Sequence, residues 1–144
     1  MTIRFRVSLL FLLLLSPFSL WAADPVELLL VRITPQVIER DQSVSWEQSL
    51  SKLTQAGNPV VVNIDADSLA IRVTVTPFVR GKDFLLVVQG DVRQRSSSGT
   101  RRSTTLQSLL VPPGEAIAFF PLGRDPGETG RQMVVRMQVE LQSE

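Results

Sequence analysis

The sequence predicts an all-β protein: an immunoglobulin-like antiparallel β-sandwich of about seven strands, preceded by a signal peptide. Two observations predict the sandwich. Apolar and polar residues alternate along most of the chain after its first two dozen residues, which is typical of strands that bury one face. Turn residues, mainly glycine, proline and serine, separate these segments at intervals of one strand. The chain has 144 residues, a length typical of one domain, so we expect a single core.

The N-terminal segment has the three parts of a secretory signal peptide. Arg4 and Arg6 form a short basic start, and a dense apolar run follows over Val7–Leu15. Ser16, Pro17 and Ser19 then break this run ahead of Ala22. We therefore predict a signal peptide over residues 1–22 that is cleaved near Ala22. The competing interpretation is an uncleaved membrane anchor, because the apolar segment is close to the shortest that spans a bilayer of ~30 Å.

The predicted mature chain is a single domain over residues 23–144, located in the periplasm or secreted. It contains no second apolar stretch of that length, so we expect no stable membrane insertion after cleavage. Because Arg4 and Arg6 precede the cleavage site and no acidic residue does, 13 of the 15 basic residues remain against 14 acidic ones. This balance provides no general attraction to nucleic acid or to an anionic membrane.

About seven segments have the alternation expected of strands. The clearest is Leu69–Val79, where the apolar side chains point to one side and the Arg and Thr side chains to the other. Turn signals at Arg80–Asp83 and at Ser96–Gly99 predict hairpins between long strands. The predicted strands are Val26–Val37, Pro59–Ile64, Leu69–Val79, Phe84–Arg95, Thr100–Val111, Ala116–Leu122 and Gln132–Gln142.

One segment departs from the alternation. Trp46, Leu50 and Leu53 are spaced four and three residues apart, as on one face of a helix, and Gly57 follows as a stop signal. This spacing predicts a short helix near residues 46–56. The alternative is an irregular strand that uses Val44, Trp46 and Gln48.

The composition excludes several kinds of chemistry. The sequence contains no histidine, cysteine or tyrosine. A Ser-His-Asp triad, a histidine or thiolate metal site and a disulfide are therefore impossible. General acid–base catalysis would depend on Asp, Glu or Lys, and the carboxylates are scattered over turns and strand ends. We therefore predict no enzyme, with no catalytic residue, metal ligand or cofactor.

One acidic segment allows an alternative. Asn63, Asp65 and Asp67 could provide oxygen ligands to a cation, but the full spacing of a calcium loop is absent. Asx residues are also favoured in turns, and we interpret this segment as a turn between strands. A small carboxylate-dependent hydrolase remains the alternative in the enzyme class, and it would need two acids that face each other in a cleft.

The most distinctive surface feature is a predicted hairpin rich in arginine. Arg93, Arg95, Arg101 and Arg102 flank its serine-rich tip, and pairing of the two arms would bring four guanidinium groups to one end of the molecule. Arginine binds phosphate, sulfate and carboxylate groups with two parallel hydrogen bonds. The alternative is that these charges keep a projecting hairpin soluble and its edges unpaired. The absence of aromatic residues near the tip argues against nucleic acid.

These observations predict a non-catalytic module that binds a protein partner or an envelope component through the four arginines. The expected role is an accessory or assembly factor of the bacterial cell envelope. The alternative is a structural subunit of a secretion or surface-appendage complex. Fold class alone does not determine the function, because one fold supports many functions.

Overall fold

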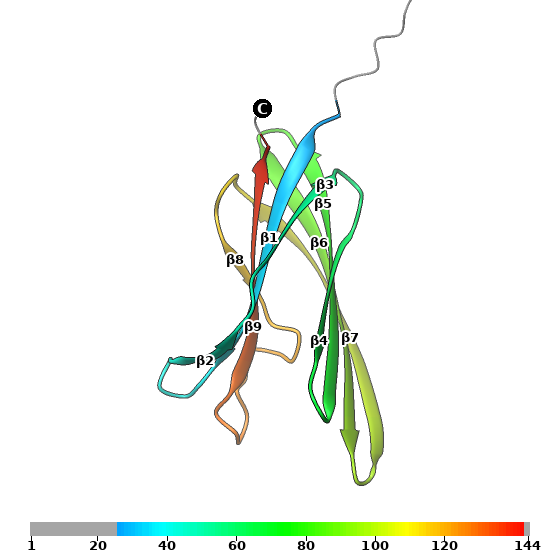
Figure 1. Ribbon diagram of the computed structural model, residues 1–144, viewed down its shortest axis with the longest axis vertical. Helices are drawn as coiled ribbons and strands as arrows, with labels where there is room; N and C mark the ends of the chain where they lie inside the picture. The colour runs from blue at the N-terminus through cyan, green and yellow to red at the C-terminus, as the bar shows by residue number, and fades with distance from the viewer. Residues whose placement is uncertain (1–25, 143–144) are drawn as a thin grey trace, which may run out of the picture.

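The structure is a computed structural model that describes residues 26–142, all of them in strands, turns or loops. Two antiparallel sheets face each other and enclose one hydrophobic core, in the manner of a β-sandwich (Figure 1). The predicted signal peptide, residues 1–22, lies outside the described residues. Within residues 26–142 no helix has the length and apolar character needed to cross a membrane.

The first sheet contains the two ends of the described chain. β1 lies near the centre of this sheet. Four of the strands are arranged in the order β2-β1-β9-β8, and β3 also pairs with β1. β9 pairs with almost the whole length of β1, so β2 and β3 share the opposite side of β1, one after the other. The strands are β1 (Leu28–Ile38), β2 (Val44–Glu47), β3 (Leu50–Gln55), β8 (Ile117–Phe119) and β9 (Gln132–Leu141).

The second sheet is a meander in which each strand pairs with the next, in the order β4-β5-β6-β7. Its central pair is joined by the predicted turn at Gly81–Lys82, and β6 and β7 are joined by Ser97–Ser98. The strands are β4 (Val60–Asp65), β5 (Leu69–Arg80), β6 (Asp83–Ser96) and β7 (Gly99–Val111). Strands therefore occur in all of the segments that the alternation predicted.

The core is formed by alternate residues of the long strands, because successive side chains of a strand point to opposite faces. The alternation predicts one inward row each for β5, β6 and β9, and most of these side chains are buried, whereas Val79 and Leu141, near the ends of β5 and β9, are 41% and 52% exposed. The side chains buried in these three rows are Ile71, Val73, Val75, Phe84, Leu86, Val88, Val92, Met133, Val135, Met137 and Val139.

The helix predicted near residues 46–56 is wrong. This segment forms β2 and β3, so the strand alternative is correct for Val44 and Trp46, whereas Gln48 lies between the two strands. Trp46, Leu50 and Leu53, which suggested a helical face, are 36–50% exposed and contribute no buried stripe. Pairing with β1 determines the conformation here, since the β1 backbone offers hydrogen-bond partners that a local helix would leave unpaired.

One close contact between the two sheets joins Phe119 of β8 to Gly90 of β6. Phe119 is fully buried, and its ring lies over Gly90 of β6. A Cβ atom added at Gly90 would come within 2.9 Å of Cε1 and 3.0 Å of Cζ of Phe119. Glycine is therefore required at this position of β6 because the ring takes the space of a side chain.

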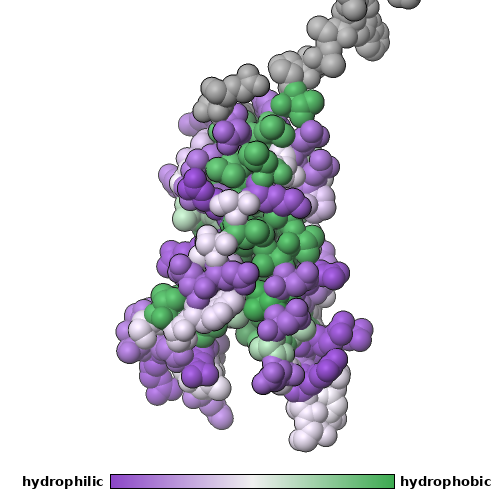
Figure 2. Space-filling view, in the orientation of Figure 1, coloured by the Kyte–Doolittle hydropathy of each residue, from purple (hydrophilic) through white to green (hydrophobic). Residues whose placement is uncertain are grey.

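At the end of the molecule away from the start of β1, the two sheets diverge into two projections (Figure 1). β2 and the loop before β9 form one projection, and the β4–β5 turn and the β6–β7 hairpin form the other. Figure 2 shows that both projections are largely hydrophilic and that a gap separates them. The predicted arginine-rich hairpin thus projects beyond the core.

Candidate functional site

The β6–β7 hairpin is long and regular. Its strands pair without interruption from Phe84 opposite Val111 to Ser96 opposite Gly99. Ser96 and Ser98 form a hydroxyl–hydroxyl hydrogen bond of 2.8 Å across the tip. Gly99 has a φ of 133°, a region that residues with a Cβ rarely adopt. The tip therefore fixes the register of both arms.

This register separates the four predicted arginines. Arg93 lies directly opposite Arg102, and Arg95 lies opposite Thr100, whereas Arg101 lies opposite Gln94. Cross-strand partners share a face and successive residues alternate between faces. Arg93, Arg95 and Arg102 are thus together on the face that points away from the core, which we call the outer face of the sheet. Arg101 is on the opposite face, so the structure brings three of the four arginines together.

The three arginines of the outer face, hereafter the arginine face, are all exposed. None of them forms an ion pair, because the ion pair found within residues 26–142 joins Arg131 and Glu39 at 3.1 Å. Like charges directly opposite each other in a sheet repel. Arg93 and Arg102 are such a pair, and an anion bound between them would reduce their repulsion.

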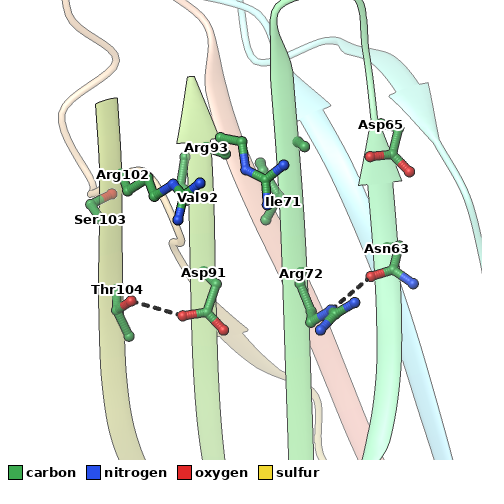
Figure 3. A pocket seen from close by; sticks show the side chains of 11 residues that line it. Asn63, Asp65, Ile71, Arg72, Asp91, Val92, Arg93, Arg102, Ser103 and Thr104 are labelled. Carbon is green, nitrogen blue, oxygen red and sulfur yellow. Dashed lines mark hydrogen bonds between the residues drawn. The ribbon is translucent and has the colours of Figure 1, made fainter. Parts of the chain in front are cut away.

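Polar residues of β6 and of its neighbouring strands lie beside Arg93 and Arg102 (Figure 3). Asp91 accepts hydrogen bonds from the Thr104 hydroxyl at 2.8 Å and from the Gln89 amide at 2.9 Å. The Arg72 guanidinium donates to the Asn63 side chain at 3.1 Å. The nearest carboxylate along β6 is therefore already hydrogen-bonded to neutral groups, and the guanidinium groups of the arginine face have no such partner.

The arginine face borders a shallow hollow of about 460 Å³ on the outer face of the sheet. Figure 3 shows Arg102 extending from β7 toward β6, and Arg93 extending from β6 toward β5. The hollow is open to solvent, and its lining includes the carboxylates of Asp65 and Asp91 beside the guanidinium groups of Arg72, Arg93 and Arg102. Its lining residues are Asn63, Asp65, Ala70, Ile71, Arg72, Asp91, Val92, Arg93, Arg102, Ser103 and Thr104.

The acidic segment considered as a cation loop is the turn between β4 and β5. The amide of Ala66 donates to the carbonyl of Leu69 at 2.8 Å, and the amide of Leu69 donates back at 3.3 Å. Asp65 and Asp67 line a smaller hollow together with Arg93 and Arg95. Residues 26–142 contain no group of three or more acidic side chains that could hold a metal ion.

An apolar row on the same outer face was missed by the sequence analysis. Leu106 and Leu110 of β7 are 65% and 55% exposed. Leu110 lies opposite Leu85, which in turn lies opposite the exposed Phe78 of β5. Counting positions from the Ser97–Ser98 turn would have placed Leu106 and Leu110 on the side of Arg102. The outer face therefore has a basic part near the hairpin tip and an apolar part farther from it.

Comparison with known protein families, with curated proteins and with solved structures gives no match to this chain.

Proposed function

We propose that this protein is a non-catalytic binding module, exported from the cytoplasm, that recognises an acidic region of a protein partner or envelope component through the outer face of the β6–β7 hairpin. The expected setting is the bacterial cell envelope, with a role as an accessory or assembly factor. A structural subunit of a secretion or surface-appendage complex is the alternative. The predicted fold is an immunoglobulin-like sandwich, whose two sheets contain strands ABED and CFG. The strand order β4-β5-β6-β7 of the second sheet does not add support for that type.

The observation that supports this proposal is the arginine face. Arg93, Arg95 and Arg102 are exposed, share one face of a continuously paired hairpin, and form no ion pair. The paired strands fix the backbone positions of these arginines, and the planar guanidinium group binds a carboxylate with two parallel hydrogen bonds. An acidic ligand would also relieve the repulsion between Arg93 and Arg102.

The experiment is capture of partners from an envelope extract by the tagged chain, with identification by mass spectrometry. The triple variant Arg93→Ser, Arg95→Ser, Arg102→Ser should lose the partner, and raising the salt concentration should weaken capture by the wild type. Arg101→Ser is the matched control, because it removes a guanidinium from the same hairpin but from the other face. A partner retained by the triple variant would contradict the proposal.

A further inference from the structure

β7 is a long edge strand with an unpaired side. It has 13 residues, and within the described chain it pairs with β6 alone and without a bulge. The other edge strands are shorter: β4 has six residues, β8 has three, and β2 and β3 have four and six with a break between them. Natural proteins usually keep edge strands short or irregular, because a long regular edge accepts a further strand.

The direction of the β7 backbone groups follows from one hydrogen bond. The Arg95 amide donates to the Ser68 carbonyl at 2.7 Å, in the turn that precedes β5. The N–H group of Arg95 therefore points away from β7. Arg95 and Thr100 are thus a non-hydrogen-bonded pair of the antiparallel ladder. Such pairs alternate along an antiparallel ladder. The residues of β7 that present N–H and C=O groups to the free edge are Thr100, Arg102, Thr104, Leu106, Ser108 and Leu110.

The same residues place their side chains on the outer face. Leu110, Leu106 and Arg102 therefore stand at intervals of four residues along the free edge, and all three are exposed. The edge thus has an apolar end and a basic end. It contains no proline, so each of its residues can donate a hydrogen bond to an added strand.

We propose that the partner binds by adding an extended segment antiparallel to β7, in continuation of a sheet that is antiparallel throughout. This inference rests on the proposed function and specifies its ligand. The segment would carry an apolar residue opposite Leu110, a second apolar residue four positions later opposite Leu106, and an Asp or Glu a further four positions later opposite Arg102. A second copy of this chain fits less well, because β7 contains no acidic residue to pair with Arg102.

The probe is a synthetic eleven-residue peptide with leucine at its second and sixth positions, glutamate at its tenth, and threonine elsewhere. We expect it to bind the folded protein and to slow amide hydrogen exchange at Leu106 and Ser108, whose N–H groups face the free edge. Replacing its glutamate by lysine should weaken binding about tenfold, since attraction to Arg102 becomes repulsion. No binding by the glutamate peptide at about 1 mM would overturn the inference.

Ser108→Pro tests the backbone contact directly. Proline removes an N–H from the free edge and takes no hydrogen bond from the ladder with β6. We expect peptide binding about tenfold weaker or lost, whereas Ser108→Thr should bind as the wild type does. Leu106→Lys is a second variant that leaves the backbone intact, should Ser108→Pro disturb folding, and it should also abolish binding.

The outcomes separate the two proposals. Partner capture that needs the arginine face but survives both Ser108→Pro and Leu106→Lys would overturn strand addition and leave the proposed function in place. Capture that is indifferent to the arginine face would overturn the proposed function itself. Concentration-dependent dimers that Ser108→Pro abolishes would show that a second copy occupies the edge, and this too would overturn the inference.

Discussion

Replacing Gly90 by alanine should destabilise the fold, because the added methyl group meets the ring of Phe119. The Cβ atom would lie 2.9 Å from Cε1, 3.0 Å from Cζ, and 3.3 Å from Cβ of Pro121. Favourable carbon–carbon contacts are about 3.5–4.0 Å. Phe119 has no exposed surface and so cannot move outward into solvent.

The magnitude follows from two opposing effects. Adding volume to a packed core costs about 1–3 kcal/mol. Replacing glycine by alanine within a strand or helix recovers about 0.5–1 kcal/mol of chain entropy. The free energy of unfolding of Gly90→Ala should therefore fall by about 0.5–2 kcal/mol, a substantial part of the 5–15 kcal/mol typical of a folded domain.

Urea unfolding measures this difference. The midpoint should fall by about 0.3–1 M with an unchanged slope, as for a change in stability alone. In the Phe119→Leu background the ring is absent, so Gly90→Ala should cost about 1 kcal/mol less than in the wild type. Equal costs in both backgrounds, or a Gly90→Ala protein as stable as the wild type, would refute the argument that the ring excludes a side chain.

Two further predictions concern the other projection. The Ser43 hydroxyl and amide donate to Asp41 and lower the pKa of its carboxyl, so Ser43→Ala should raise that pKa toward 3.8 in an NMR titration. Because the pKa of Asp41 is lower in the folded state than in the unfolded state, the hydrogen bonds from Ser43 stabilise the fold at pH values above the unfolded-state pKa. This contribution to stability is lost as the pH falls through the folded-state pKa. An Asp41 pKa that is unchanged in Ser43→Ala would contradict this prediction. Arg131→Ala should change stability by only about 0–1 kcal/mol, since the Arg131 side chain in its pair with Glu39 is 67% exposed; a larger loss on thermal unfolding would contradict this.

The sequence was sufficient to predict most of the strands because alternation is a local property. The row Ile71, Val73 and Val75 is apolar at every second position, and these residues are buried in the core. The helix predicted near Trp46 is wrong because three exposed apolar residues have helical spacing by chance. Its strands depend on pairing with β1, which local spacing does not encode.

The candidate site was predictable in part. The Ser97–Ser98 turn brings the two arms together, as expected, but Arg101 and Arg102 are adjacent in a strand and must point to opposite faces. This consequence of strand geometry was available from the sequence. The contact between Phe119 and Gly90 was not, because it joins two sheets whose relative position depends on the whole core.

The most direct test of the central claim compares two neighbouring arginines. Binding of the captured partner should be measured for the wild type, Arg101→Ser and Arg102→Ser over a range of salt concentrations. The two variants have the same net charge and differ in which face of the hairpin loses a guanidinium. We predict that Arg102→Ser binds about threefold more weakly or worse with a reduced salt dependence, and that Arg101→Ser binds as the wild type does. Equal effects of the two substitutions would contradict recognition through the outer face.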